Sequence, residues 1–138
     1  MQEVSVLKFV ADNIYLVAIA TVSGVMLMWP SLRRGAGVSV QQATLMINRQ
    51  DALVLDVRES DEFEKGHVIG SRSLPLGQIE ARAGELEKYK AKPVVLVCHS
   101  GNRSGMAVGR LRKLGFQQVF NLSGGVTAWQ QAGLPLEK

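Results

Sequence analysis

The sequence has a single cysteine, Cys98, and only two histidines, His67 and His99, which stand far apart in the chain. One cysteine excludes an intramolecular disulfide, and without a CxxC pair or neighbouring histidines the usual zinc sites are excluded as well. We therefore expect neither a metal nor a cofactor. A lone thiol is also typical of a reducing compartment.

A large excess of charge of one sign is lacking too, since 16 Lys and Arg residues stand against 12 Asp and Glu residues and the net charge is +4. The basic residues are scattered, with small groups at 88–92 and 110–113. Neither group forms the basic stripe with interleaved aromatic residues that marks a nucleic-acid-binding surface. We expect solvated surface lysines and no nucleic-acid partner.

Charge is entirely absent from the 20 residues 13–32. As a helix, this segment would span about 30 Å, which is the thickness of the hydrocarbon core of a bilayer. Tyr15 and Trp29 lie near its two ends, where amphipathic rings favour the membrane interface. The sequence therefore predicts one transmembrane helix, within an N-terminal anchor and linker that covers residues 1–37.

Basic residues mark the downstream side of this segment, where Arg33 and Arg34 follow at once, whereas Lys8 on the upstream side is accompanied by Glu3 and Asp12. By the positive-inside rule, the C-terminal part of the chain then faces the cytoplasm. This predicts a single-pass membrane protein, with the lipid bilayer as a partner and a membrane protein as a further candidate partner. A cleaved signal peptide and a buried core helix are the alternatives.

The residues from 38 to 138 alternate between strand-like and helical patterns. Nearly continuous apolar runs, typical of strands buried on both faces, lie at 52–57 and 93–97, and 118–120 is a third predicted strand. Helical patterns lie around them at 39–48, 60–64, 79–89, 104–114 and 126–132. The alternation predicts an α/β domain over 38–138, with a parallel sheet flanked by helices.

Chemically reactive residues follow two of these strands, at the sheet edge where ligands bind in open parallel sheets. Cys98 comes directly after the second strand, Gly101 permits an unusual φ, and Ser104 begins the next helix. Loop N–H groups and a helix N-terminus stabilise an anion, so they favour the nucleophilic thiolate over the thiol. Arg103 and Arg58 add positive charge. The alternative is that Cys98 is a small buried hydrophobic residue.

Four segments resemble the rhodanese family, and they occur in that family's order. Residues 98–104 read CHSGNRS, which matches the active loop C-x-x-G-x-R-[SA]. The other three read LDVRE at 55–59, GHVIGSRSLP at 66–75 and NLSGGVTAWQQAGLP at 121–135. Ser71 and Ser73 depart from the Ala and Asn of the third family motif, which concerns local packing more than catalysis.

The resemblance implies a single-domain thiosulfate sulfurtransferase of the rhodanese-like fold. Cys98 would take the outer sulfur of thiosulfate as a persulfide and pass it to cyanide or to a thiol. The loop that would cradle the persulfide consists of His99, Ser100, Gly101, Asn102, Arg103 and Ser104. Asp56 would support the loop by accepting backbone N–H groups. Arg58 would either bear on the anionic substrate or form a salt bridge to a loop carboxylate.

Two other functions stay open at this point. Phosphatases of the same fold have an active loop longer by one residue, and the shorter loop here suits a sulfur atom better than a tetrahedral phosphate. A membrane-tethered binding module without turnover would keep the fold but would not need Cys98. The expected partners are a small sulfur-containing anion and a protein or low-molecular-weight thiol.

Overall fold

The computed structural model describes residues 2–33 and 37–138, and the chain divides into two compact units, Met1–Arg33 and Arg34–Lys138. Arg34 and most of the predicted linker lie outside the described residues. Gly37, which the sequence analysis assigned to the linker, already belongs to the sheet of the second unit, because it pairs with Asn121.

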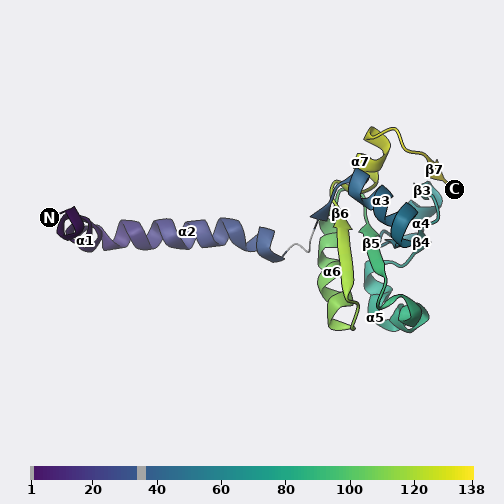
Figure 1. Ribbon diagram of the computed structural model, residues 1–138, viewed down its shortest axis with the longest axis horizontal. Helices are drawn as coiled ribbons and strands as arrows, with labels where there is room; N and C mark the ends of the chain where they lie inside the picture. The colour runs from purple at the N-terminus through teal and green to yellow at the C-terminus, as the bar shows by residue number, and fades with distance from the viewer. Residues whose placement is uncertain (1, 34–36) are drawn as a thin grey trace. The chain divides into compact units, whose positions relative to one another are not determined.

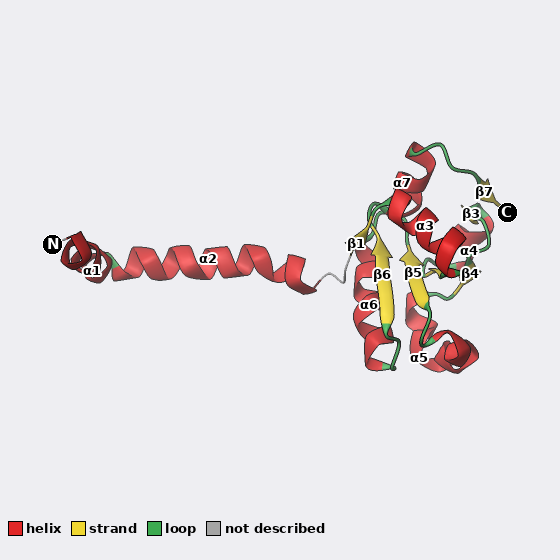
Figure 2. Ribbon diagram, viewed as in Figure 1, coloured by secondary structure: helices red, strands yellow, loops and turns green. Residues whose placement is uncertain are grey.

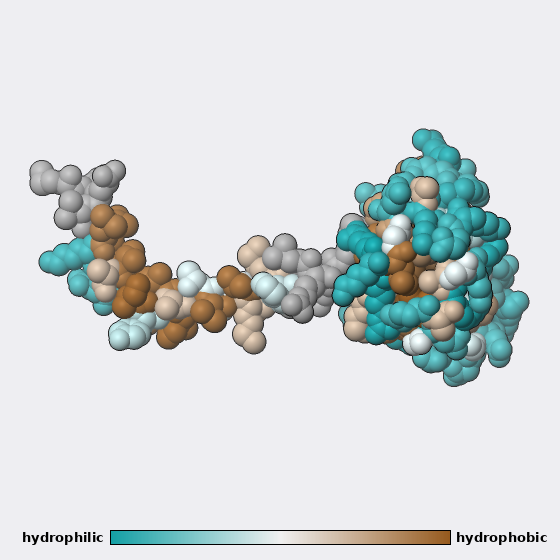
Figure 3. Space-filling view, turned by 90° about the horizontal axis from the view of Figure 1, so that it is seen from below, coloured by the Kyte–Doolittle hydropathy of each residue, from teal (hydrophilic) through white to brown (hydrophobic). Residues whose placement is uncertain are grey.

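The N-terminal unit consists of α1 (Gln2–Asp12) and α2 (Ile14–Arg33). The apolar pattern predicted α2 almost to the residue, whereas α1 was not predicted. Large apolar side chains such as Val22 and Leu27 are exposed along α2, and Figure 3 shows the apolar surface that results.

Within the described residues, no single helix combines the length and the hydropathy of a membrane span. The segments Ser5–Asp12 and Ile14–Trp29 meet both requirements only together, across a bend of 82°. The prediction of one transmembrane helix over residues 13–32 is therefore not confirmed.

The second unit is built around a five-stranded sheet with the order β1-β6-β5-β2-β4, in which every neighbouring pair is parallel (Figure 1). Its strands are β1 (Gly37–Val38), β2 (Leu53–Asp56), β4 (Arg72–Ser73), β5 (Pro93–Val97) and β6 (Gln118–Leu122). The two central strands β2 and β5 are buried along their whole length, as their apolar runs predicted. The α/β class and the parallel sheet are thus confirmed.

Helices cover both faces of this sheet (Figure 2). They are α3 (Val40–Gln50), α4 (Ser60–Glu64), α5 (Ile79–Arg82), α6 (Asn102–Lys113) and α7 (Gly125–Gln131), with the 3-10 turns η1 (Leu76–Gln78) and η2 (Ala83–Tyr89). The predicted capping box is present at α3, where the Ser39 side chain accepts from the Gln42 N–H and the Gln42 side chain accepts from the Ser39 N–H.

Alternate strand residues point to opposite faces and build two separate cores. On one face, Leu55 and Leu96 pack against Leu111 of α6 and Ile79 of α5. On the other face, strand residues including Val95 pack with residues of α3 and α7. Cys98 continues the alternation of Leu96 and therefore lies on the face covered by α6.

A small antiparallel pair, β3 (His67–Val68) and β7 (Leu136–Glu137), ties the C-terminus to the domain. The ring of His67 stacks on Phe63 with 3.7 Å between the ring centroids, and its Nδ1 lies 2.9 Å from the Phe63 carbonyl oxygen. Its Nε2 lies 3.3 Å from a Glu137 carboxylate oxygen.

Two local predictions differ from the structure, and the two departures from the family motif affect local packing. The helix predicted over 79–89 is α-helical only at Ile79–Arg82 and continues as a 3-10 turn. The helix after the cysteine begins at Asn102 rather than at Ser104. Ser71 and Ser73, the two departures from the family motif, both bury a hydroxyl oxygen that has no hydrogen-bond partner among the described residues.

Candidate active site

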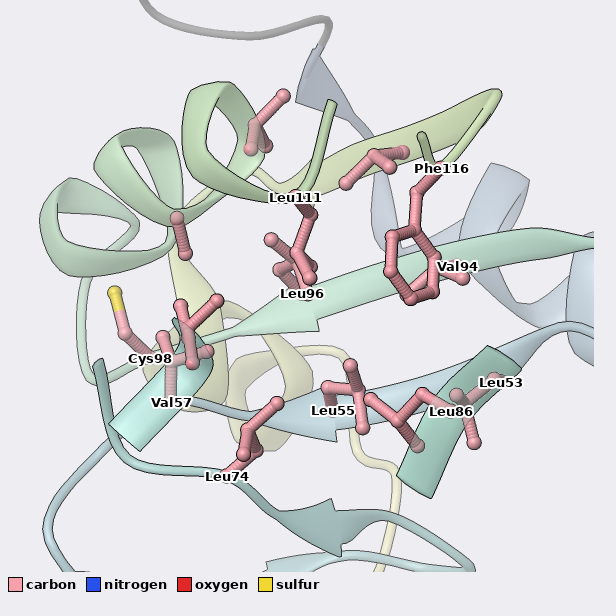
Figure 4. Close-up of a cluster of buried hydrophobic side chains, with 14 residues drawn as sticks. Leu53, Leu55, Val57, Leu74, Leu86, Val94, Leu96, Cys98, Leu111 and Phe116 are labelled. Atoms are coloured by element: carbon pink, nitrogen blue, oxygen red, sulfur yellow. The ribbon is translucent and has the colours of Figure 1, made fainter. Parts of the chain in front are cut away.

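Cys98 lies at the carboxyl end of β5, at the border of the core below α6 (Figure 4). Its position follows from the strand register, because Asp56 of β2 pairs with Val97 of β5 and the Val57 N–H donates to the Val97 carbonyl at 2.9 Å. The two chemically reactive strand ends are therefore neighbours. Cys98 is only 1% exposed, so the loop that follows it covers its sulfur.

Hydrogen-bond donors from this loop converge on the sulfur. The Gly101 N–H donates to Sγ at 2.9 Å, and the Ser104 Oγ lies 3.3 Å from Sγ. Gly101 adopts a φ of 98°, which favours glycine at this position. The loop thus directs its N–H groups inward, toward the cysteine.

These donors change the pKa of the Cys98 thiol. Burial raises it, but hydrogen bonds from the Ser104 hydroxyl and from the N–H groups of Ser104, Gly101 and Ser100 together lower it by more. The net pKa therefore lies below the ordinary thiol value, as expected for a nucleophilic cysteine.

The loop carbonyls point the other way, because residues at the end of β6 and at the start of α7 donate hydrogen bonds to them. The hydrogen bonds run from the Val126 N–H to the Cys98 carbonyl at 2.8 Å, from the Thr127 Oγ1 to the His99 carbonyl at 3.0 Å, and from the Asn121 Nδ2 to the Gly101 carbonyl at 3.1 Å. A peptide plane with its carbonyl held outward presents its N–H on the opposite side. The segment 121–127 thus helps to fix the anion-binding orientation of the loop.

Asn121 is a site residue that the sequence analysis did not single out. Its amide is buried, donates to the Gly101 carbonyl, and accepts a short hydrogen bond from the Ser104 hydroxyl through Oδ1. The single hydroxyl hydrogen of Ser104 can point to Asn121 or to the Cys98 sulfur, but not to both. The sequence gives one signal for Asn121, which is that it directly precedes the Leu-x-Gly-Gly of the last family motif.

Arg103 does not stand free beside the sulfur, because it forms a bidentate ion pair with Glu62 of α4. The two nitrogen–oxygen distances are 2.6 and 2.9 Å. The hydrogen bond from Arg103 lowers the pKa of Glu62 to about 2, against a smaller opposing effect of burial. The same hydrogen bond raises the pKa of Arg103. The positive charge that the sequence analysis expected from Arg103 is thus paired with a carboxylate, and Glu62 is a residue that the sequence analysis missed.

Arg58 is likewise paired with a carboxylate, but this is Asp56 at the end of β2 and not the loop carboxylate of the sequence analysis. Its Nη2 lies 2.6 Å from Asp56 Oδ2 and donates at 2.7 Å to the Gly66 carbonyl. Asp56 also accepts from the Arg58 backbone N–H at 3.0 Å. Both side chains are buried, so the pair holds together the ends of β2 and of the turn before β3.

The remaining loop residues face solvent. His99, Ser100 and Asn102 are exposed, and within residues 2–33 and 37–138 their side chains form no hydrogen bond or ion pair. His99 borders a cavity of about 280 Å³ beside the loop. The other residues that line it are Arg58, Glu62, Lys65, Gly66, Val126, Gln130 and Leu136. In the described part of the chain, no three His, Cys, Asp or Glu side chains gather as metal ligands do.

Comparisons with known proteins agree with this geometry. Residues 39–132 match the family described as rhodanese-like domain. The protein YibN of Escherichia coli (strain K12) is 47% identical over 96 residues, which cover 69% of this chain and 67% of YibN. The thiosulfate sulfurtransferase GlpE of Pseudoalteromonas translucida is 30% identical over 95 residues, which cover 69% of this chain and 89% of GlpE.

Among solved structures, the thiosulfate sulfurtransferase of Pseudomonas aeruginosa superimposes with a TM-score of 0.67 at 27% identity, over 75% of this chain and 20% of that one. Three findings lead to one conclusion. They are the sequence match over most of the second unit, the shared parallel sheet, and the cysteine loop at the carboxyl end of β5. The chain belongs to the rhodanese-like domain family.

Proposed function

We propose that the chain is a sulfurtransferase in which Cys98 carries the transferred sulfur as a persulfide. The observation that carries this proposal is the Gly101 N–H that donates to the Cys98 sulfur at 2.9 Å, with the Ser104 Oγ a further 3.3 Å from the same sulfur. Such donors stabilise a thiolate and, after transfer, the terminal sulfur of a persulfide. Relatives named as sulfurtransferases support the same chemistry.

The chemistry is a pair of displacements at sulfur. The Cys98 thiolate attacks the outer sulfur of a donor such as thiosulfate, the sulfur–sulfur bond of the donor breaks, and its electron pair leaves with sulfite. An acceptor thiolate or cyanide then attacks the outer sulfur of the persulfide, and the electron pair returns to Cys98. No external oxidant or reductant is needed.

The test compares the wild type with Cys98→Ser in sulfur transfer from a sulfane donor to cyanide. A hydroxyl supplies almost no nucleophile at neutral pH, so we expect turnover to fall by more than about a thousandfold. Circular dichroism should show an unchanged fold. Full activity of Cys98→Ser would rule out the covalent route.

A binding module without turnover is the second candidate, favoured by the 1% exposure of Cys98. On this reading, the loop holds an anion or a partner's thiol, and the buried sulfur never reacts. The two candidates differ in one result, since a module would gain no sulfur from any sulfane donor.

We also propose that the N-terminal unit binds a lipid bilayer and that the second unit faces the cytoplasm. The support is the apolar surface of α2 together with the joint span of Ser5–Asp12 and Ile14–Trp29. Arg33 and Arg34 set the proposed orientation. A reporter fused to the C-terminus should be active only on the cytoplasmic side, and an outward-facing C-terminus would refute the orientation.

A further inference from the structure

Three basic side chains gather around the ring of Tyr89 and form what we call the basic cluster. The guanidinium carbon of Arg72 lies 5.4 Å from the ring centroid, and the ammonium nitrogens of Lys88 and Lys92 lie 5.1 and 6.0 Å from it. Cations at such distances are attracted to the face of an aromatic ring. One tyrosine thus holds together three positive charges, two of which belong to the group at 88–92 that the sequence analysis expected to be solvated surface lysines.

The basic cluster lies at the amino ends of the parallel strands, whereas Cys98 lies at the carboxyl end of β5. Arg72 begins β4, and the two lysines of the cluster lie in the segment that leads into β5. They border a cavity of about 380 Å³, which is also lined by residues 51–54, where β2 begins, and by Gly70. The cysteine loop, residues 98–104, lies outside this lining, so the cavity is separate from the candidate active site.

Positive charge exceeds negative charge in the lining of this cavity. The lining carries three basic side chains and one carboxylate, Asp51, which lies 2.9 Å from the Lys92 ammonium group. Arg72 and Lys88 form no ion pair within residues 2–33 and 37–138. After the Asp51–Lys92 pair is subtracted, two uncompensated positive charges remain.

The carboxylates that stand close to Lys88 in the sequence do not supply the missing negative charge. Glu85 is paired with Arg82 at 3.2 Å, and Glu87 is paired with Lys90 at 2.8 Å. Cations that are held around one ring repel one another, and an anion bound between them would remove that repulsion. The cavity therefore favours an anionic ligand.

The size and the walls of the cavity favour an anion that carries an organic group. A phosphate monoester has about two negative charges at neutral pH, which matches the two uncompensated positive charges. Its oxygens accept charge-assisted hydrogen bonds from guanidinium and ammonium groups. The cavity exceeds what one phosphate group fills, and Ala52, Leu53 and the ring of Tyr89 give it apolar walls. Such a combination is typical of sites for small organic ligands.

We infer that this cavity binds an organic phosphate monoester, with the phosphate group between Arg72 and Lys88 and the organic part against Ala52 and Tyr89. The inference concerns a second site and does not depend on sulfur transfer through Cys98. A free small molecule and the headgroup of a phospholipid can both present this chemistry, and the experiment separates the two sources.

Calorimetric titration of the full chain in a non-ionic detergent measures the binding of AMP and of adenosine, which lacks the phosphate. AMP should bind at least about tenfold more tightly than adenosine. Arg72→Gln and Lys88→Gln each remove one positive charge, so each should weaken AMP binding about fivefold. Lys113→Gln is the matched control, because Lys113 is exposed on α6 and lies outside the cavity lining. It should change the affinity less than about twofold.

Sedimentation with phosphatidylcholine vesicles, with and without phosphatidic acid, distinguishes a lipid headgroup from a free molecule. If phosphatidic acid strengthens vesicle binding more in the wild type than in Arg72→Gln, the phosphate belongs to a lipid, and equal gains assign it to a free molecule. Circular dichroism shows whether each variant is folded, and Lys88→Gln serves if Arg72→Gln is not.

Three results would overturn the inference. One is a wild type that binds adenosine or inorganic phosphate as tightly as AMP. Another is an equal loss of AMP affinity in Lys113→Gln and in Arg72→Gln. The third is a wild type that does not bind AMP and that responds to phosphatidic acid no more than Arg72→Gln does.

Discussion

Asn121 links two parts of the site that lie far apart in the sequence. It donates to the Gly101 carbonyl and accepts from the Ser104 hydroxyl, so one buried amide holds both the loop and the start of α6. An aliphatic residue of similar size could fill the same space, but it would leave these two groups unpaired. The amide is therefore needed for its hydrogen bonds.

We predict that Asn121→Ala destabilises the domain by about 1–3 kcal/mol in urea unfolding, since it leaves buried partners unsatisfied. The loop loses its anchor at Gly101, so the N–H groups around Cys98 become less well placed and turnover should fall. Asn102→Ala is the control, because that side chain is exposed and forms no hydrogen bond within the described residues. Equal effects of the two substitutions would contradict the account.

The Glu62–Arg103 pair predicts a pH dependence of stability. The pKa of Glu62 is lowered in the folded chain from 4.5 to about 2, so the folded state binds its proton less readily than the unfolded state does. This contribution is fully present above pH 4.5 and is lost as the pH falls toward 2. Glu62→Gln should cost about 1 kcal/mol at neutral pH and should flatten the acid limb of the stability curve. An acid limb identical to that of the wild type would refute this contribution.

Sequence reasoning identified the residues that a short motif brings together, but not those that meet only after folding. Cys98, Gly101 and Ser104 are near neighbours in the chain, and their chemistry could be inferred from their order. Glu62 meets Arg103 across 41 residues, and Asn121 meets Ser104 across 17. Neither contact follows from local pattern, so the neutralisation of Arg103 could not be foreseen.

At the level of elements, α7 acts on the cysteine loop through backbone contacts. Its first residues donate to the Cys98 and His99 carbonyls, which requires the two backbones to approach closely. Gly125 makes this approach possible, because a Cβ there would overlap the Cys98 carbonyl oxygen and its φ is 57°. The pair of glycines that precedes Val126 thus has a structural reason.

We expect Gly125→Ala to destabilise the domain by about 1–3 kcal/mol and to lower activity, because the cysteine loop must move to accommodate the methyl group. Gly109→Ala provides the opposite control. Gly109 lies within α6, and nothing lies within 4 Å of a Cβ placed there. That substitution should raise stability by about 0.5–1 kcal/mol and leave activity unchanged. Thermal unfolding and turnover of both variants test this expectation, and an unchanged stability of Gly125→Ala would contradict it.

The elements themselves were predictable to different degrees. The buried strands β2 and β5 and the amphipathic helix α6 carry strong local patterns, and each was anticipated. The strand β1 has only two residues and forms because β6 offers an open edge, which is a tertiary cause. The 3-10 turn at Ala83–Tyr89 has helical composition, so its tighter winding could not be read from the pattern.

At the scale of the whole molecule, the chain separates into an apolar N-terminal unit and a domain with its own two cores. Both cores consist entirely of residues from the second unit. We therefore expect the second unit to fold without α1 or α2.

We predict that residues 34–138, expressed alone, fold and retain the turnover of the full chain within about twofold. Circular dichroism and cooperative urea unfolding measure the fold, and the same transfer assay measures the activity. The full chain should sediment with phospholipid vesicles, whereas the fragment should stay in solution. An unfolded fragment would show that the two units depend on each other.

The most direct test of the central claim is the intact mass of the protein after brief incubation with a sulfane donor and removal of the excess. Because Cys98 is the single cysteine, the account predicts a gain of one sulfur atom in the wild type, reversed by an added thiol or cyanide. Cys98→Ser should gain nothing under the same conditions. An unchanged mass of the wild type with cysteine persulfide and with thiosulfate, or an equal gain in Cys98→Ser, would contradict a persulfide on Cys98.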